Sequence, residues 1–291
     1  MHRVFQGLHT TVIQGDALEI LDERIPDHSV HLIFADPPYN IGKQFSRFVD
    51  KWPSDIEYAR WCEQWLALCI SKLTDNGSMY VMASTQCMPP IDLFMRTRMT
   101  VLSRIVWHYD SSGVQAKSRY GSMYEPILFC VKNERCYTFN ADDVRVEAKT
   151  GAKRKLIDYR KSTPAQYNPS KVPGNVWYFP RVRYRMPEYE EHPSQKPELL
   201  LERIIKASSN QGELVLDPFS GTFTTSSVAK RLGRVSIGIE REQEYVKIGL
   251  RRLGIQEHLD GEKLAPPDKT YVRKNGKRHS NGCSEQQPAL F

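Results

Sequence analysis

The sequence predicts an α/β fold in which a mostly parallel sheet carries helices on both faces, and three observations support this. Apolar runs typical of strands alternate with segments of helical periodicity from residue 10 to about 131, and the alternation returns after residue 191. Several runs lack polar alternation, which is typical of strands buried on both faces. Acids follow four of the runs, as expected at the ligand-binding edge of such a sheet.

The elements follow one another in a clear order. Seven strands are expected, at VIQG (12–15), VHLIFA (30–35), SMYVMAS (78–84), SRIVWHYD (103–110), EPILFCVK (125–132), ELVLD (213–217) and RVSIGIE (234–240). Six helices are expected, at ALEILDERI (17–25), IEYARWCEQWLALCISKL (56–73), IDLFMRTRM (91–99), PELLLERIIKASS (197–209), TFTTSSVAKRL (222–232) and EYVKIGLRRL (244–253). The fourth helix begins with a proline, which suits a first helical turn.

Length and composition limit the class of protein. The chain has 291 residues, of which 40% are hydrophobic, so we expect one large domain with a smaller lobe. It has no apolar stretch of membrane-spanning length and no signal-peptide pattern at its start. The six cysteines form no C-x-x-C pair, so we expect reduced thiols, no metal site and a cytoplasmic location.

Positive charge is concentrated in the middle of the chain. The formal net charge is +7, and residues 141–190 hold eleven lysines and arginines against six acids, with seven aromatic residues among them. Such a mixture suits a surface that holds phosphates and stacks bases. The alternative is a solvated, irregular lobe around its own aromatic core. We expect the polar tail from residue 257 to be disordered, with its basic residues as possible non-specific DNA contacts.

Four acids end apolar runs, at Asp16, Asp36, Asp217 and Glu240. Each could simply cap a helix, but four together favour one shared site at the sheet edge. Gly221 permits a tight turn near a ligand. The chain lacks both the P-loop and the G-x-G-x-x-G pattern, while Glu240 is suitably placed for a ribose diol, so we expect an adenosine-type cofactor without a pyrophosphate.

The sequence D-P-P-Y at 36–39 suits chemistry on an amine. The prolines stiffen the loop, and a carboxylate together with a backbone carbonyl can accept both hydrogens of an exocyclic amine. Tyr39 offers a flat face for a base. A base reaches such a pocket when it is flipped out of a duplex or is already single-stranded.

These residues resemble the S-adenosylmethionine-dependent DNA amino-methyltransferases, over most of residues 10–255. The family motifs are [DNS]-P-P-[YFW], found here at 36–39, and D-P-F-x-G-x-G, found as DPFSGTF at 217–223. The order of the two motifs, and HPSQKP at 192–197, are similar to the circularly permuted β-group. Three segments, GSMYEPIL, VPGNVWYFPRVRY and HPSQKPE, are similar to a type of solitary bacterial adenine methyltransferase that reads ATGCAT.

The resemblance implies a Rossmann-like methyltransferase fold with a seven-stranded sheet, an inserted target-recognition lobe and the following roles. Asp36 and the Pro37 carbonyl hold the target amine, Pro38 completes the rigid loop, and Tyr39 stacks on the flipped base. Cofactor contacts are expected from Asp16 at the adenine, Lys196 near the methionine carboxylate, Glu240 at the ribose and the turn that contains Asp217, Phe219, Ser220, Gly221 and Thr222. Phe223 replaces the second glycine of the family motif, which puts the close approach of the chain there in doubt.

The expected boundaries are 1–135 for the catalytic half, 136–190 for the target-recognition lobe, 191–256 for the cofactor half and 257–291 for the basic tail. DNA contacts are expected from Lys117, Arg119, Lys153, Arg154, Lys155, Arg181 and Arg183. The resemblance further implies double-stranded DNA as partner, an association with the bacterial nucleoid and a possible homodimer.

The activity that the resemblance favours is adenine-N6 methylation by base flipping and direct in-line transfer, because in that family Asp at the first motif position leans to adenine and Ser to cytosine. Cytosine-N4 methylation uses the same chemistry and stays open. RNA or protein-amide methylation is disfavoured by the motif order, and a catalytically inactive DNA-binding protein is disfavoured by the intact motif. Cytosine-C5 methylation needs a cysteine nucleophile, usually after proline, and the chain has no Pro-Cys pair.

Overall fold

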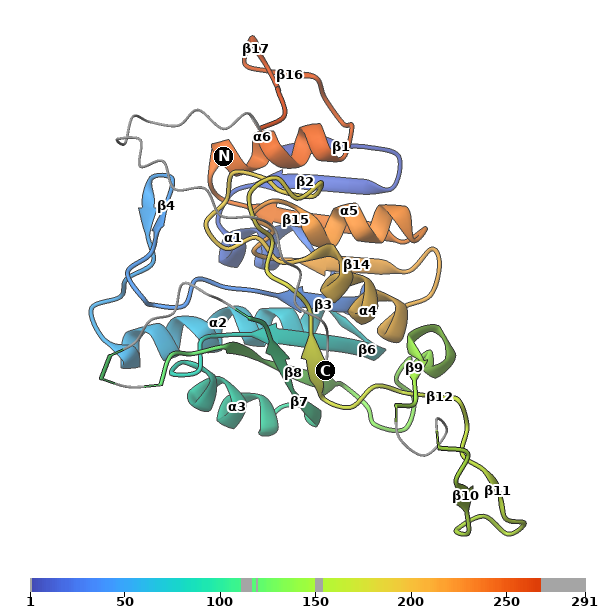
Figure 1. The fold of residues 1–291 in the computed structure, drawn as a ribbon. Helices are drawn as coiled ribbons and strands as arrows, with labels where there is room; N and C mark the ends of the chain where they lie inside the picture. The colour runs from blue at the N-terminus through green and yellow to red at the C-terminus, as the bar shows by residue number, and fades with distance from the viewer. Residues whose placement is uncertain (1, 111–116, 119, 150–153, 268–291) are drawn as a thin grey trace, which may run out of the picture.

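The computed structural model describes residues 2–110, 117–118, 120–149 and 154–267, and one large sheet organises them (Figure 1). Its strands are β1 (Arg3–Gln6), β2 (Thr10–Gln14), β3 (Val30–Ala35), β6 (Leu73–Met82), β7 (Thr100–His108), β8 (Tyr124–Val131), β13 (Val176–Tyr178), β14 (Leu214–Asp217) and β15 (Val235–Glu240). They lie in the order β1-β2-β15-β14-β3-β6-β8-β7-β13. The strands from β2 to β6 pair in parallel, whereas β1 and β8 run antiparallel to their neighbours.

The seven expected strands are all present, and β1 and β13 extend the sheet at its two edges. Neither edge strand has the apolar run of a central strand. β1 buries a single residue, Phe5, and β13 is three residues long with Trp177 as its one buried side chain.

Helices cover both faces of the sheet, as expected. α1 (Ala17–Arg24), α2 (Asp55–Lys72) and α3 (Met88–Arg96) bury their apolar sides in one cluster with β3, β6 and β8. α4 (Glu198–Ser208) and α5 (Thr224–Arg231) pack on the opposite face, and α6 (Gln243–Arg252) packs beyond them against β2. The six expected helices are therefore confirmed.

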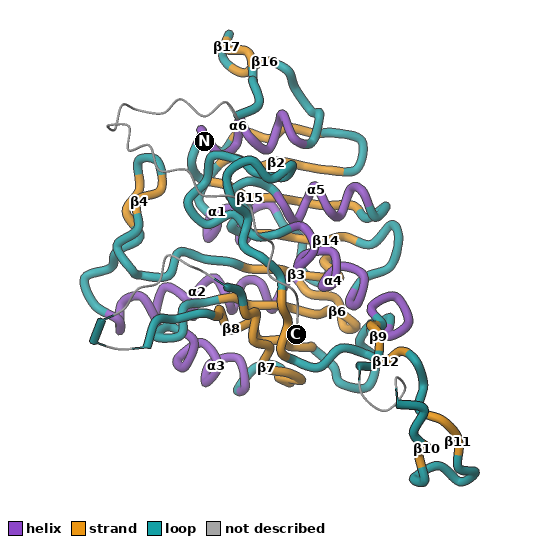
Figure 2. Tube along the Cα trace, in the orientation of Figure 1, coloured by secondary structure: helices purple, strands orange, loops and turns teal. Residues whose placement is uncertain are grey.

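The segment between β8 and α4 is mostly loop (Figure 2). It contains the 3-10 turn η1 (Ala141–Val144) and two small strand pairs, β9 (Val146–Glu147) with β12 (Ser170–Lys171) and β10 (Ile157–Asp158) with β11 (Ala165–Gln166). The β10–β11 arm projects from the body of the molecule (Figure 1). The same segment supplies β13, so the expected lobe is anchored on the main sheet.

The chain stays folded beyond residue 257, contrary to the expected start of disorder. β16 (His258–Leu259) and β17 (Glu262–Lys263) form a hairpin. Leu259 and Leu264 are buried against Leu250, Leu253 and Phe5, which explains why this piece is ordered. The remainder of the predicted tail, residues 268–291, lies outside the described residues.

Across the described ranges, no helix is long and apolar enough to cross a membrane. The cysteines described there, at 62, 69, 87, 130 and 136, are free thiols, and no cluster of three or more potential metal ligands occurs among the same residues.

Candidate active site

A cavity of about 420 Å³ opens at the carboxyl ends of the parallel strands. The four predicted acids, Asp16, Asp36, Asp217 and Glu240, all line it. β14 pairs directly with β3, so Asp36 and Asp217 follow the ends of neighbouring strands although 181 positions separate them in sequence. The prediction of one shared rim is therefore confirmed.

A buried carboxylate that the sequence did not point to holds the loop after β3. Asp50 is 1% exposed and accepts hydrogen bonds from the backbone N–H groups of Tyr39 (3.1 Å) and Lys43. The backbone of Asp50 also pairs with Lys43 and Gly42, which closes the short hairpin β4 (Gln44–Phe45) and β5 (Phe48–Val49). Asp50 thus fixes the backbone of the D-P-P-Y loop, and it also lines the cavity.

The backbone carbonyls of the same loop differ in whether they already accept a hydrogen bond. The Tyr58 hydroxyl donates to the Pro38 carbonyl at 2.7 Å, and the Cys87 thiol donates to the Tyr39 carbonyl at 3.1 Å. Within the described part of the chain, the Pro37 carbonyl receives no hydrogen bond, and Pro37 lines the cavity. The Pro37 carbonyl therefore has free capacity to accept from a ligand.

A compact polar cluster surrounds Asp36. The Lys196 ammonium lies 2.6 Å from Asp36 Oδ2 and 3.7 Å from Glu125 Oε2. The Tyr39 hydroxyl lies 2.5 Å from Asp36 Oδ1 and 3.0 Å from Glu125 Oε2, and the Tyr109 hydroxyl donates to Glu125 Oε1 at 3.3 Å. The expected placement of Lys196 near a methionine carboxylate thus differs from its contacts here, which join it to the target-amine side of the cavity.

Burial and charge set the protonation of this cluster. Burial raises the pKa of the Asp36 carboxyl, although the Lys196 ammonium opposes the change. Burial works against the charge on Lys196, but the carboxylates of Asp36 and Glu125 outweigh it and raise the pKa of the ammonium. Burial, followed by the same two acids, raises the pKa of the Tyr39 hydroxyl well above 10. Lys196 therefore stays a cation and Tyr39 a neutral hydroxyl.

On the side of the cavity where the cofactor is expected, Asp217 is buried at the end of β14. It accepts hydrogen bonds from the Phe219 backbone N–H at 3.0 Å and from the Thr225 hydroxyl at 2.5 Å. Burial raises the pKa of its carboxyl to about 7, against the effect of these donors. A cation bound beside this carboxyl would lower its pKa again, because the cation favours the ionised form.

Glu240 at the end of β15 fastens the turn that follows β14. Its Oε2 accepts from the Gly221 backbone N–H at 2.8 Å and its Oε1 from the Glu242 backbone N–H at 2.7 Å. Burial raises the pKa of its carboxyl to about 7. Gly221 has φ +49°, and a Cβ there would lie 3.0 Å from the His192 ring, so both the turn and the space require glycine.

Phe223, the departure from the family motif, keeps the left-handed backbone that the missing glycine would favour, with φ 58° and ψ 34°. Its ring is fully buried, and a Cβ on Gly238 or Gly249 would overlap it at 2.7 or 2.3 Å. The two glycines therefore provide the space for this ring. The turn survives the replacement because burial of the ring offsets the cost of the backbone conformation.

The remaining predicted cofactor residues also line the cavity. Asp16 caps α1 by accepting from the Leu18 N–H at 2.9 Å, so it serves the helix as well as the cavity wall. Ser220 and Thr222 already use their hydroxyls within the turn. Phe219 packs in an aromatic wall, in which its ring lies 5.7 Å from the ring of Trp61 and 5.1 Å from the ring of Trp65.

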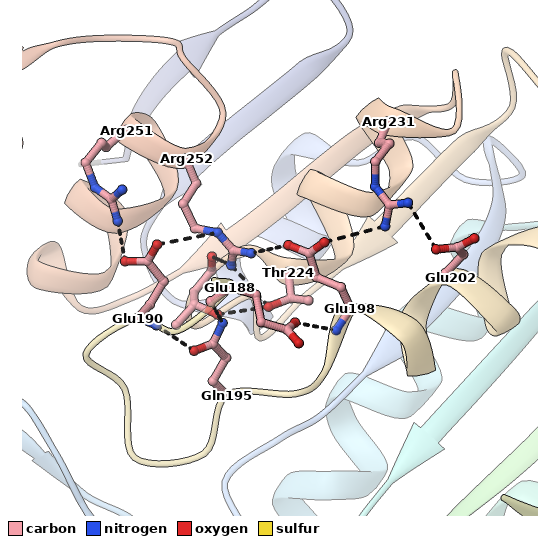
Figure 3. A network of polar contacts seen from close by, with 10 residues as sticks. Glu188, Glu190, Gln195, Glu198, Glu202, Thr224, Arg231, Arg251 and Arg252 are labelled. Carbon is pink, nitrogen blue, oxygen red and sulfur yellow. Dashed lines mark hydrogen bonds and ion pairs between the residues drawn. The ribbon is translucent and has the colours of Figure 1, made fainter. Parts of the chain in front are cut away.

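A network of ion pairs holds the segment that carries Lys196 (Figure 3). Arg252 at the end of α6 is 7% exposed at its side chain and lies 2.8 Å from Glu198 and 3.8 Å from Glu190. It also donates at 2.7 Å to the Thr222 carbonyl, which lies in the turn of residues 217–223 after β14, called the cofactor turn below. Arg252 therefore ties the segment before α4 to the cofactor turn.

The expected DNA contacts are divided. Arg181 lines the cavity, with its guanidinium 5.1 Å from the centre of the Tyr109 ring, rather than facing outward. Arg183 is exposed and donates to the Asp110 carbonyl, and Lys117, Arg154 and Lys155 are exposed as well. Arg119 and Lys153 lie outside the described residues.

These side chains fit the cofactor implied by the resemblance. Asp217 offers a buried carboxylate to an ammonium, and Glu240 offers acceptors to ribose hydroxyls. The aromatic wall suits an adenine ring or a sulfonium cation.

Comparisons with known proteins agree with the geometry. A family model described as DNA methylase matches residues 30–251. The chain is 57% identical over 281 residues to the DNA adenine methyltransferase YhdJ of Escherichia coli (strain K12), an alignment that covers 97% of this chain and 94% of the relative. It is 33% identical over 244 residues to the Type II methyltransferase M.HpaI of Haemophilus parainfluenzae, covering 83% and 73%.

Solved structures share the fold. The crystal structure of M1.HpyAVI aligns with a TM-score of 0.56 at 24% identity, covering 85% of this chain and 100% of that one. The cytosine-N4-specific PvuII DNA methyltransferase aligns with a TM-score of 0.65 at 18% identity, covering 88% and 90%. At these identities the likeness concerns the fold, which is the α/β methyltransferase fold expected from the sequence.

Proposed function

We propose, since the chain belongs to the DNA methylase family, that it transfers a methyl group from S-adenosylmethionine to N6 of adenine in double-stranded DNA. One observation carries the proposal. Asp36 and the Pro37 carbonyl, two acceptors suited to an exocyclic amine, share one cavity with Asp217 and Glu240, two carboxyls suited to the cofactor.

The residues of the chain act mainly by positioning. S-adenosylmethionine supplies an electrophilic methyl group on its sulfonium. Asp36 and the Pro37 carbonyl accept the two amine hydrogens, which turns the nitrogen lone pair out of the ring plane toward that methyl group. Asp36 also stabilises the positive charge that develops on the amine. Tyr39 presents its ring to the flipped base.

Adenine is favoured over cytosine by the 57% identity to a protein named as an adenine methyltransferase and by Asp at position 36. Cytosine-N4 methylation is the second candidate, since it requires the same grip on an exocyclic amine. The fold does not separate the two, because the cytosine-N4-specific PvuII enzyme shares it.

The DNA duplex would lie across the cavity mouth and the basic segment 136–190, within the bacterial nucleoid. Exposed cations of that segment, such as Arg154 and Lys155, would hold phosphates.

A homodimer is a further proposal taken from the β-group resemblance. Sedimentation of the purified chain with and without a DNA duplex would give its oligomeric state.

The first experiment asks which base is methylated. Purified protein would be incubated with unmethylated genomic DNA and isotope-labelled S-adenosylmethionine, and the DNA digested to nucleosides for mass spectrometry. We expect labelled N6-methyladenine that disappears with Asp36→Ala, and mapping of the modified adenines would test ATGCAT as the recognition sequence. Labelled N4-methylcytosine would overturn the base assignment. Cofactor binding without any label in DNA would overturn the DNA-enzyme proposal.

A further inference from the structure

A second acid, Glu125, lies beside Asp36 although it does not follow a parallel strand. β8 runs antiparallel to β6, so its first residues reach the same edge of the sheet at which the parallel strands end. Glu125 is the second residue of β8 and pairs in register with Trp107 on β7. Its carboxylate therefore faces the cavity that the acids of the parallel strands share.

One hydroxyl stands between the two acids. The Tyr39 oxygen is 2.5 Å from Asp36 Oδ1 and 3.0 Å from Glu125 Oε2. A phenol has a single proton, so it donates to one carboxylate at a time. The shorter distance places that proton toward Asp36 at rest, and rotation about the C–O bond redirects it to Glu125.

The proposed reaction leaves a proton to be removed on the Asp36 side. When N6 bonds to the methyl carbon and the carbon–sulfur electron pair stays on sulfur, the product nitrogen is cationic and carries one proton too many. Asp36 is the acid placed at that nitrogen, and burial, which raises its pKa, favours its accepting a proton. If Asp36 takes up the proton as the nitrogen–carbon bond forms, the rate of methyl transfer itself depends on how readily Asp36 passes the proton on.

We propose that Asp36, the Tyr39 hydroxyl and Glu125 form a proton relay that carries the amine proton away from the target base. The N6 proton passes to Asp36 Oδ1 and then to the Tyr39 oxygen, while the Tyr39 hydroxyl proton passes to Glu125 Oε2. Asp36 and Tyr39 end as they began, and Glu125 gains the one proton that N6 lost. The inference rests on the proposed methyltransferase function.

The neighbouring groups suit this direction of transfer. Lys196 lies closer to Asp36 than to Glu125, at 2.6 against 3.7 Å, so it restores the ionised form of Asp36 more strongly. The Tyr109 hydroxyl donates to the other oxygen of Glu125, and Arg181 lies over the Tyr109 ring. Lys43 is the further cation that faces both acids. The side chains of Asp36 and Glu125 are exposed to similar extents, 14% and 16%, so the position of Lys196 rather than solvent access sets the direction of transfer. Glu125 lines the cavity and can release the proton into it.

The test compares three variants in single-turnover methyl transfer, where product release does not mask the step. Glu125→Gln keeps the size and hydrogen bonds of the side chain but cannot take a proton. Tyr39→Phe keeps the stacking ring and removes the conducting hydroxyl. Each should slow the rate roughly 10²-fold. Because both break the same chain of proton transfer, the double variant should be no slower than either single one.

Other readouts separate the relay from a structural role. Fluorescence of 2-aminopurine at the target position should show unchanged base flipping, and the dissociation constant of the cofactor should stay within twofold. The dependence of the single-turnover rate on the deuterium content of the solvent should be curved for the wild-type protein and linear for both variants, because only the intact relay moves more than one proton in the same step. Formate should restore activity to Glu125→Ala, since a small acid can replace the missing carboxylate.

Two results would overturn the relay. One is a wild-type rate in Glu125→Gln while Asp36→Ala is inactive, which removes the relay and leaves the proposed function standing. The other is additive slowing in the double variant with no rescue by formate, which assigns Glu125 a packing role. Absence of DNA methylation by the wild-type protein itself would be the separate failure of the proposed function.

Discussion

Two buried carboxyls on the cofactor side, Asp217 and Glu240, have pKa values of about 7, raised by burial from the ordinary acidic range. Well below pH 7 the protonated form of each carboxyl predominates in the free protein. An ammonium and ribose hydroxyls bind an ionised carboxylate more strongly than a neutral carboxyl, so binding at low pH is coupled to the release of these protons. We expect the cofactor affinity to rise about tenfold per pH unit for each proton released between pH 5.5 and 7, and to level off above pH 8.

Calorimetric titrations in buffers of different ionisation enthalpy would count the protons directly. Glu240→Gln cannot ionise, so it should bind the cofactor more weakly at pH 8. Below pH 7 it should release one proton fewer on binding than the wild-type protein does. An affinity that is flat between pH 5.5 and 8 would contradict the roles given to both acids.

The sequence identified the residues whose position follows from strand direction. Asp36 and Asp217 follow apolar runs, and parallel pairing brings such ends together. Glu125 precedes its apolar run, so it reaches the same edge because β8 is antiparallel, and an apolar run does not reveal its direction. Asp50 was missed for another reason, since its partners are backbone N–H groups of a loop whose path depends on the whole fold.

At the scale of elements, the central strands and the helices were predictable because each buries an apolar run or stripe. β1 and β13 were not, because an edge strand needs few buried residues, and β13 depends on the side of β7 that it meets. The β16–β17 hairpin was predicted as disorder for a similar reason. Its two buried leucines contact residues from both ends of the chain, Phe5 and Leu250 among them.

The contacts that connect α6, the cofactor turn and the segment before α4 depend mainly on one buried cation, Arg252. Arg252→Met removes a guanidinium that contacts Glu198, Glu190 and the Thr222 carbonyl. Glu190 keeps its pair with Arg251 and Glu198 its pair with Arg231, but both acids lose their buried partner, so we expect a loss of about 1.5–3 kcal/mol in the free energy of unfolding. Because the turn also loses a donor, the cofactor affinity should fall. Urea denaturation and a binding titration would measure the two effects.

Arg231 provides a matched control in the same network (Figure 3). Its side chain is 49% exposed and pairs with Glu198 and Glu202 at the surface. Arg231→Met should therefore cost less than about 1 kcal/mol. Equal losses in the two variants would mean that burial of Arg252 does not decide the strength of these contacts.

At the scale of the whole molecule, the order of the motifs in the chain does not decide which residues meet at the cavity. β14 and β15, which come late in the sequence, lie between β2 and β3, which come early. The target-amine and cofactor residues therefore end on adjacent strands, while the long connection between them is free to leave the body as the basic segment. This connection places cations beyond the cavity, where a duplex too large for the cavity can be held.

The projecting β10–β11 arm should supply part of the electrostatic contact with DNA. Arg154, Lys155 and Lys161 are exposed on it, whereas Arg160 is paired with Asp158. Changing the three exposed cations together to glutamine should weaken DNA binding and reduce the slope of log affinity against log salt concentration by up to about 3. Fluorescence anisotropy of a labelled duplex would measure the affinity and its salt dependence. Salt concentrations of roughly 50 to 300 mM cover the range in which phosphate contacts are screened.

The control removes the same charge from another face. Arg24, Arg60 and Arg98 are exposed on or beside the helices α1, α2 and α3, away from the arm. If the arm contacts phosphates, glutamine at these three positions should leave the salt slope nearly unchanged, since net charge alone has a weaker and longer-range effect. Equal slopes in the two triple variants would assign the affinity to net charge and would remove the arm from the DNA interface.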